Sequence, residues 1–151
     1  MKIKVGVFFG GKSVEHEVSV ISGIQAMNAF DREKYDPVPI YITKENEMYT
    51  GEAVGDIKNY RNIPDLLKKS TRFFFICDNG KLNLVQYPEK KFGNSAVDYI
   101  DVAFPVVHGA NVEDGSLQGF LRHYNIPLVG CDVMAAAASM DKYVMKAILK
   151  D

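Results

Sequence analysis

A run of apolar residues near the start of the chain, Ile3 to Phe9, constrains the fold more than any other feature of the sequence. It reads I-K-V-G-V-F-F and is almost continuously apolar, which indicates a strand buried on both faces. Strands of this kind occur in parallel sheets that helices cover on both sides. Gly10 and Gly11 end the run. The sequence therefore predicts an α/β fold with this strand inside a sheet flanked by helices.

A helix and a second strand are expected next. Helical periodicity extends from about Glu15 to Phe30, and residues 35–42 (Y-D-P-V-P-I-Y-I) read as a strand. Because Pro37 and Pro39 cannot donate hydrogen bonds to a neighbouring strand, we place this strand toward an edge. Strand, helix and strand together form one βαβ unit, for which a right-handed crossover is expected.

The segment 46–96 departs from this pattern. Asn79-Gly80 lies between two β-rich runs, and Asn-Gly in that setting is a strong hairpin signal. The expected elements are a short strand at 47–52, a short helix at 63–69 and hairpin strands at 72–77 and 81–87. We interpret residues 46–96 as an antiparallel excursion from a mainly parallel sheet.

The α/β pattern then returns. The expected elements are a buried strand at 99–107, a helix at 114–123, a short strand at 126–129 and helical segments at 134–138 and 141–150. The last helix has no stop signal, such as a following glycine or proline, which favours a fragment cut from a longer protein.

Composition excludes several classes of protein. The 151 residues are 47% hydrophobic and 25% charged, as in ordinary globular domains, and predict one domain with at most the start of a second. A net charge of −1 without a basic block argues against nucleic acid as a partner. No segment has the 18 apolar residues of a membrane span, so we expect no membrane association. Lys2 and Lys4 do not precede an apolar signal region, and the absence of an export signal predicts a cytoplasmic location. Cys77 and Cys131 lack metal-site spacing and are predicted to be reduced, buried thiols.

The first candidate site is the turn after the first strand. Residues 6–13, G-V-F-F-G-G-K-S, match the P-loop pattern G-x-x-x-x-G-K-[ST], so a nucleotide hydrolase is one alternative. Against it, three bulky residues at 7–9 belong to the predicted strand, and the carboxylates of Glu15 and Glu17 would repel a triphosphate. The same charge suits an ammonium group, so Glu15 is a candidate for binding an amine. The competing interpretation is that Glu15 only stabilises the positive end of the helix.

The second candidate site is the loop after the strand at 99–107. It reads H-G-A-N-V-E-D-G-S-L-Q-G from His108 to Gly119. His108 can donate a hydrogen bond to an anionic or carbonyl oxygen, and the glycines permit close approach to a ligand. A tightly capped connection with an idle histidine is the structural alternative. Both loops follow strands of one parallel sheet, so we expect them to share an edge. A third candidate, Lys142, begins the last helix.

At these residues the sequence resembles the D-alanine–D-alanine ligase family of ATP-grasp enzymes. The stretch from Gly10 to Ser19 is similar to the family's G-G-x-S-x-E-x-x-V-S. The stretch from His108 to Gly119 is similar to H-G-x-x-G-E-D-G-x-x-Q-G, and Ser139 to Lys142 matches S-M-D-K. The likeness covers essentially the whole chain. It implies a Rossmann-like, pre-ATP-grasp substrate-binding domain at residues 1–130, followed at 131–151 by the start of a truncated central ATP-grasp domain.

The resemblance also implies an activity. Family members use ATP and Mg²⁺ to phosphorylate the carboxylate of one D-alanine, and the amine of a second substrate then attacks the acyl phosphate to form a dipeptide for peptidoglycan. By resemblance, Glu15 is the catalytic residue that holds the first ammonium group, with Val18 beside it. His108 resembles the histidine near the reacting carboxylate, and Lys142 resembles a lysine that reaches the ATP phosphates. The partners implied are D-alanine, ATP and, as in other members, a second copy in a homodimer.

The chain departs from the pattern at Val112, where the family has glycine. A left-handed valine would cost about 1–2 kcal/mol, so we predict a negative φ at Val112 and a re-routed loop. The magnesium ligands, the glycine-rich lid and the second-substrate pocket are expected beyond residue 151, which leaves the second substrate open between D-alanine, D-serine and D-lactate. We expect the 151-residue chain to be inactive alone. A non-catalytic amino-acid-binding module is the remaining alternative.

Overall fold

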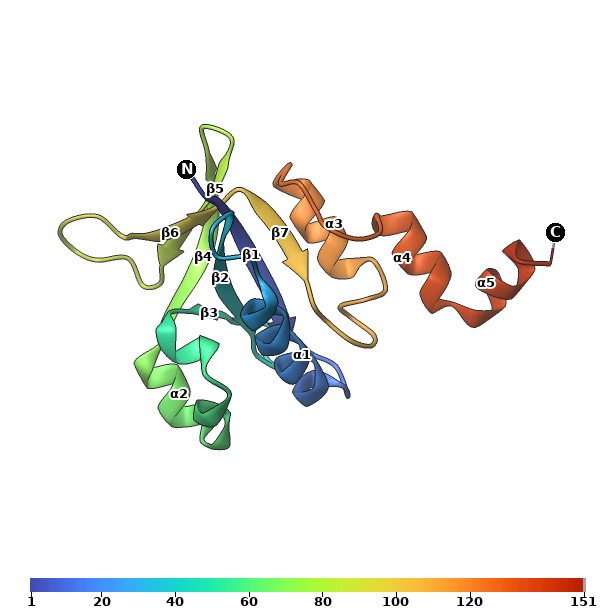
Figure 1. The fold of residues 1–151 in the computed structure, drawn as a ribbon, viewed down its shortest axis with the longest axis horizontal. Coiled ribbons are helices and arrows are strands. Elements are labelled where there is room, and N and C mark those ends of the chain that lie inside the picture. Colours follow the sequence, from blue (N-terminus) through green and yellow to red (C-terminus); the bar gives the residue numbers. More distant parts are fainter. Residues whose placement is uncertain (151) are drawn as a thin grey trace.

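The apolar run at the start of the chain forms strand β1 (Ile3–Gly10), inside a seven-stranded sheet (Figure 1). The computed structural model describes residues 1–150. β1 pairs in parallel with β2 (Tyr35–Ile42) on one side and with β7 (Val102–Pro105) on the other. Val7 and Phe8 point to opposite faces of the sheet and both are fully buried. The prediction of a strand buried on both faces is confirmed.

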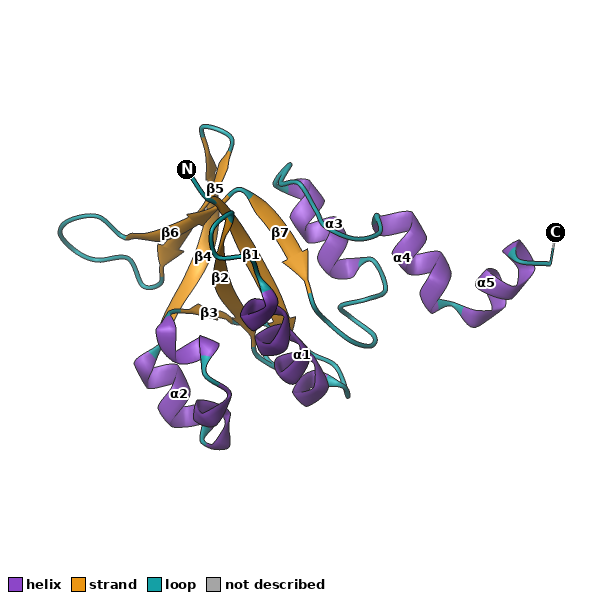
Figure 2. Cartoon of the chain, viewed as in Figure 1, coloured by secondary structure: helices purple, strands orange, loops and turns teal. Residues whose placement is uncertain are grey.

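The other elements follow the expected order closely (Figure 2). The helices are α1 (His16–Ala29), 3₁₀ turns at Glu52–Gly55 and Ile57–Arg61, α2 (Ile63–Lys69), α3 (Ser116–His123), α4 (Val133–Met140) and α5 (Lys142–Ile148). The remaining strands are β3 (Met48–Thr50), β4 (Thr71–Asp78), β5 (Lys81–Gln86) and β6 (Ala96–Ile100).

One sheet contains all the strands, in the order β6-β5-β4-β3-β2-β1-β7. Its parallel part is β2-β1-β7, and antiparallel pairs from β2 to β6 extend it. The expected α/β class, with a single sheet flanked by helices, is confirmed. The sheet is mixed rather than mainly parallel, because two strand pairs are parallel and four are antiparallel. The antiparallel segment predicted at 46–96 adds strands to this sheet and also supplies α2, which covers one face.

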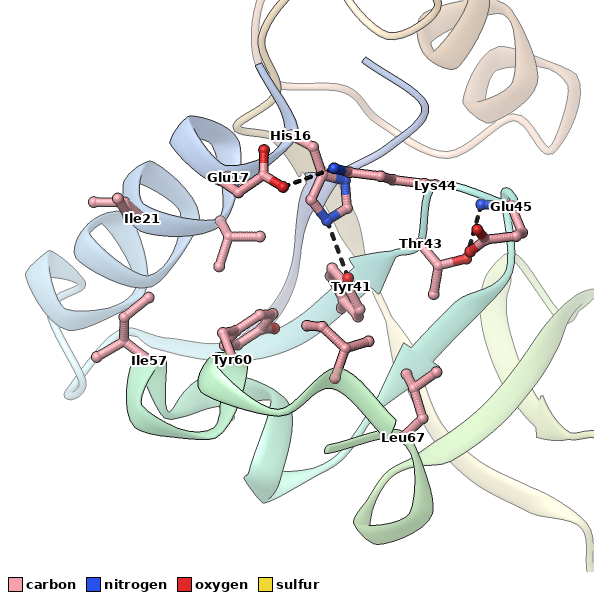
Figure 3. Close-up of a pocket in the computed structure, with 12 residues that line it drawn as sticks. His16, Glu17, Ile21, Tyr41, Thr43, Lys44, Glu45, Ile57, Tyr60 and Leu67 are labelled. Atoms are coloured by element: carbon pink, nitrogen blue, oxygen red, sulfur yellow. Dashed lines mark hydrogen bonds and ion pairs between the residues drawn. The ribbon is translucent and has the colours of Figure 1, made fainter. Parts of the chain in front are cut away.

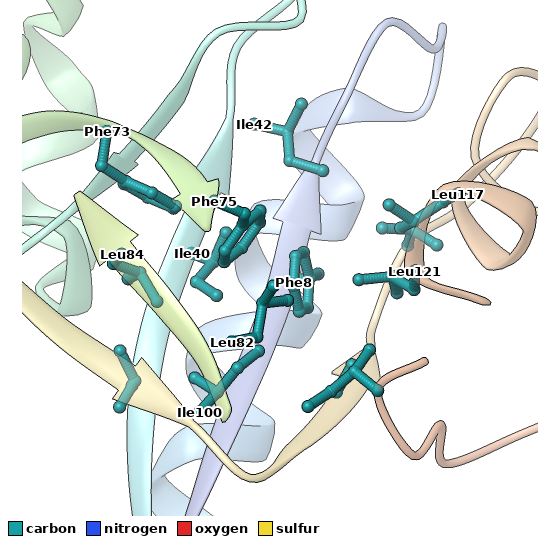
Figure 4. Packing of buried hydrophobic residues seen from close by; sticks show 14 of the residues in the cluster. Phe8, Ile40, Ile42, Phe73, Phe75, Leu82, Leu84, Ile100, Leu117 and Leu121 are labelled. Carbon is teal, nitrogen blue, oxygen red and sulfur yellow. The ribbon is translucent and has the colours of Figure 1, made fainter. Parts of the chain in front are cut away.

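Helices cover the two faces of the sheet and create two apolar cores. On one face, α3 packs Leu117 and Leu121 toward Phe8 and the aromatic residues of β4 (Figure 4). On the other face, α1 and α2 cover Val5, Val7 and Phe9 (Figure 1). Gly23 allows α1 to lie close to the sheet, since a Cβ atom there would be 2.5 Å from Phe9. The sheet thus holds α1 firmly, and α1 carries part of the candidate site.

The prediction that the second strand lies toward an edge is wrong for the strand as a whole. β2 has a neighbour on each side, but β3 pairs only with its last two residues, Tyr41 and Ile42. Pro37 and Pro39 precede that pairing. Thr50 Oγ donates to the carbonyl of Pro39 at 2.7 Å, so the Pro39 backbone faces away from β1. The prolines therefore mark a stretch of an interior strand that pairs with β1 but, among the described residues, has no strand neighbour on its other side.

The prediction of a single strand at 99–107 is also wrong. It breaks at Asp101 into β6 and β7, which occupy opposite ends of the sheet order. Asp101 binds Lys4 twice: its backbone N–H donates to the Lys4 carbonyl, and its carboxylate accepts the Lys4 N–H, both at 2.9 Å. Lys4 also pairs with Asp98 on β6. Because one residue joins the two end strands, the sheet must curl until its edges meet beside β1.

The C-terminal elements lie beyond β7. The strand expected at 126–129 is reduced to a parallel bridge between Ala103 and Leu128. The helices predicted around 134–138 and 141–150 are present as α4 and α5, which extend away from the sheet (Figure 1). Within residues 1–150, no helix combines the length and hydropathy needed to cross a membrane.

Candidate functional site

The turn between β1 and α1 is built on two glycines and a buried hydrogen-bond network. Gly10 and Gly11 have φ of +89° and +92°, angles that residues with a Cβ rarely adopt. The buried His16 ring binds the Gly11 carbonyl through Nδ1 at 2.7 Å, so Nδ1 must carry a proton. Its Nε2 lies 3.0 Å from the Tyr41 hydroxyl. His16 therefore fixes the shape of the turn, a role that the sequence interpretation missed.

Ser19 ties this turn to the neighbouring strand. Its hydroxyl is fully buried, accepts the Gly10 N–H and donates to the Val106 carbonyl, each at 2.8 Å. One side chain thus joins the end of β1, the first turns of α1 and the residue after β7. It holds together the segments from which the two candidate loops emerge.

The two predicted loops meet at the edge of the sheet. The Asn111 side-chain amide donates to the Lys12 carbonyl at 3.0 Å. A Cβ atom added to Gly109 would lie 2.3 Å from Ser13 Oγ and 3.1 Å from a carboxylate oxygen of Glu15. Gly109 has φ of +89°, so both its conformation and its surroundings favour glycine. The structure therefore places the exposed Glu15 carboxylate where the loops join, as the shared edge predicts.

Acidic side chains hold the second loop in shape. Glu113 accepts the Gly109 N–H at 2.6 Å, and Asp114 accepts the Asn111 N–H at 2.7 Å. Asp114 also accepts the Ser116 N–H at the start of α3, as expected for a residue before a helix. Hydrogen bonds from Ser116 and from backbone N–H groups hold the pKa of Asp114 below its ordinary value. Asp114 is therefore an anionic anchor of the loop.

Val112 has the negative φ that we predicted. Among the described non-glycine residues, positive φ values occur only at asparagines, and Asn111 has φ of +68°. The neighbouring Val112 is buried, with its side chain against Gly11. The left-handed position thus falls one residue earlier, on a residue type that tolerates it.

The first helix connects the remaining predicted site residues. Glu15 occupies the N-cap position of α1 without a capping hydrogen bond from its side chain, and Val18, one turn further, is 54% exposed. His108, half-buried after β7, places Nε2 3.1 Å from the Ser22 hydroxyl of α1. Ser22 was not among the predicted residues, although its spacing from Glu15 and Val18 could have indicated a shared helix face. Lys142 is exposed on α5, which lies well apart from α1 in Figure 1, so the structure does not bring it to the other three.

Two sequence interpretations do not fit the structure. Cys77 and Cys131 are free thiols, as predicted, but both are exposed rather than buried. Cys77 ends up exposed because it lies near the tip of the β4–β5 hairpin, beyond the helices that cover the sheet. The P-loop match also fails, since residues 6–9 lie in β1, with 6–8 paired on both sides, and cannot wrap around a phosphate.

A separate cavity of about 390 Å³ lies between α1, the end of β2 and α2 (Figure 3). Tyr41 and Tyr60 pack edge to face in its wall, and burial raises the pKa of Tyr41 to about 12. At its rim, Lys44 pairs with Glu17 at 2.7 Å and lowers the pKa of that carboxyl. Glu15, Val18 and His108 do not line this cavity, so it is distinct from the loop junction.

Comparisons with known proteins agree on one family. The model of the D-ala D-ala ligase N-terminus matches residues 4–131. A D-alanine–D-alanine ligase of Thermosipho melanesiensis is 41% identical over 150 residues, which cover 99% of this chain and 40% of that protein. The solved D-alanine–D-alanine ligase of Coxiella burnetii, 29% identical, has a TM-score of 0.81 over 99% of this chain and 41% of its own. That of Bacillus anthracis, solved with ATP, is 25% identical with a TM-score of 0.59, over 99% of this chain and 35% of its own. The chain thus spans about two fifths of the length of these relatives or less.

Proposed function

The chain belongs to the D-alanine–D-alanine ligase family, as its N-terminal domain, and we propose on that premise that it binds the first D-alanine of an ATP-dependent ligase. The observation that carries this proposal is the position of the Glu15 carboxylate, exposed at the junction of the two loops. A carboxylate attracts the ammonium group of an amino acid.

Val18 on α1 and His108 in the second loop complete the proposed subsite. Val18 offers an exposed apolar surface one turn from Glu15, suited to the methyl group of alanine. His108 offers a ring nitrogen to an oxygen of the substrate carboxylate. Charge, apolar surface and donor together match the three substituents around the α-carbon of D-alanine.

In the whole protein we propose an acyl transfer. The first D-alanine carboxylate takes the γ-phosphoryl group of ATP and becomes an acyl phosphate, with ADP released. The second substrate's amine then forms the C–N bond as the C–O bond to phosphate breaks, and the amine loses a proton. Donors placed at the developing oxyanion stabilise such a step, which is the part proposed for His108. The dipeptide product would serve peptidoglycan synthesis in the cytoplasm.

Lys142 is the remaining candidate for a contact with ATP. Lys142 is exposed and takes part in none of the ion pairs among residues 1–150, so its ammonium group fits a phosphate contact. That same range contains no cluster of three His, Cys, Asp or Glu residues that could hold a metal, so we assign no Mg²⁺ ligand here. Mg²⁺ would neutralise phosphate charge when bound. We further propose a boundary between residues 1–130 and 131–151, a homodimer as the assembly, and no turnover by the 151-residue chain alone.

The test is D-alanine-dependent ADP formation with Mg²⁺ by the full-length protein, beside its Glu15→Gln variant. Glutamine keeps the shape but removes the charge, so kcat/KM for D-alanine should fall roughly 10- to 100-fold, as for a lost charge-assisted hydrogen bond. Glu33→Gln is the matched control, because Glu33 is exposed in the connection after α1, away from the loop junction. Equal activity in parent and Glu15→Gln would remove Glu15 from the site, and an inactive parent would refute the proposed reaction.

A further inference from the structure

One face of α1 carries a series of side chains toward the second loop. Glu15, Val18 and Ser22 are spaced three and four residues apart, so they lie on the same side of the helix. With a rise of about 1.5 Å per residue, Ser22 lies roughly 6 Å beyond Val18 along the axis, and Glu15 roughly 4.5 Å before it. Val18 therefore occupies the middle of this face, between a carboxylate and a hydroxyl.

The hydroxyl at the far end holds the candidate histidine. Ser22 Oγ lies 3.1 Å from His108 Nε2, in a contact that joins α1 to the loop after β7. Both side chains are half-buried, which limits competition from water. Within residues 1–150, the other ring nitrogen, Nδ1, has no hydrogen-bond partner. One nitrogen of His108 is thus engaged by the protein and the other is left for a ligand.

We propose that Ser22 is a positioning residue, whose hydroxyl donates to His108 Nε2 and so keeps the proton of the neutral ring on Nδ1. A neutral imidazole has one donor and one acceptor, so the bond made by one nitrogen sets the role of the other. The Nδ1–H group is then available to donate to an oxygen of the substrate. This inference rests on the proposed function, because it assigns the orientation of His108 in the same D-alanine subsite.

The contact between Ser22 and His108 also fixes the distance between the two ends of the proposed subsite. His108 is in a loop, and loops are more mobile than the helices they contact. Fixing its ring to α1 sets the distance between His108 and Glu15, which is anchored at the start of the same helix. A small substrate held by its ammonium group at one end then meets the histidine at a fixed position. A catalytic group held at a constant distance needs no reorganisation when the substrate binds.

The experiment compares Ser22→Ala and Ser22→Thr in the full-length protein. ¹⁵N NMR of labelled histidine reports which nitrogen of His108 is protonated, with His108→Gln to assign its signals. The parent and Ser22→Thr should show a proton on Nδ1, and Ser22→Ala should lose that preference. The KM for the first D-alanine, or kcat/KM, should worsen roughly tenfold in Ser22→Ala, as expected for one lost hydrogen bond, and recover in Ser22→Thr.

The outcomes separate this inference from the function on which it rests. A proton on Nε2 in the parent, or an unchanged tautomer in Ser22→Ala, would overturn the assignment of Ser22. Unchanged kinetics in Ser22→Ala together with a strong loss of activity in Glu15→Gln would also overturn the assignment of Ser22. That result would leave the ligase proposal unaffected. An inactive parent with the expected tautomers would refute the D-alanine role of His108 together with the proposed reaction.

Discussion

Replacing Ser19 by alanine is the sharpest test of how the candidate site is built. The Ser19 hydroxyl is fully buried, accepts the Gly10 N–H and donates to the Val106 carbonyl. Alanine removes both bonds and leaves the buried Gly10 N–H and the part-buried Val106 carbonyl without this partner. Each such group costs about 1–3 kcal/mol, so the free energy of unfolding should fall by roughly 2–6 kcal/mol. Domains have total stabilities of about 5–15 kcal/mol, which makes this a large loss.

Urea unfolding followed by circular dichroism measures this change directly. A protein of this size shifts its midpoint temperature by about 2–4 °C per kcal/mol, so thermal scans should show a fall on the order of 10 °C. Ser139→Ala is the control, because Ser139 is exposed on α4 and alanine suits a helix. If Ser19→Ala kept its stability within about 0.5 kcal/mol of the parent, as ordinary surface substitutions do, the hydroxyl would not be holding the two strand ends.

Two further predictions concern the same region. Burial raises the pKa of Tyr41 to about 12, so the stability that it contributes is complete below its unfolded value of about 10 and is lost as the pH rises toward 12. Urea unfolding at pH 9 and pH 11 should show this decline in stability, and the decline should be smaller in Tyr41→Phe. Part of the decline that remains in the variant comes from Tyr60, because burial raises the pKa of that tyrosine as well. An equal decline in Tyr41→Phe and the parent would contradict the assignment to Tyr41. Val112→Ala removes two buried methyl groups that cover the turn and should cost roughly 1.5–2 kcal/mol in the same assay, and no loss would show that this contact contributes nothing.

Much of the fold could be predicted because its signals are local. The apolar run at 3–9, the Asn79-Gly80 hairpin and the helix at 63–69 each depend on residues close in sequence. The break at Asp101 could not be predicted in this way. Its cause is a pair of hydrogen bonds to Lys4, 97 residues away, and a strand pattern carries no record of a partner at that distance.

The candidate site also contains residues that could be predicted from the sequence and residues that could not. Glu15 and His108 were candidates because of their charge and hydrogen-bonding chemistry, and the resemblance to the family added Val18 and the specific roles. The meeting of the two loops followed from the parallel sheet. His16 and Ser19 were missed, since their function depends on buried partners that the sequence does not reveal. Cys77 was misjudged for a related reason, because apolar neighbours do not show whether a helix covers that part of a strand.

The parallel pairing of β1 with β7 determines the order in which a growing chain can acquire this structure. β1 is synthesised before β7, because its neighbour on that side lies almost a hundred residues later in the chain. Contacts of such long range form slowly because a long loop must close first. Until β7 and Val106 are synthesised, the nascent chain has an unpaired edge on β1 and no anchor for Ser19. Such an edge is a template for association with other chains, so β1 stays open to that association until residue 106 has been made.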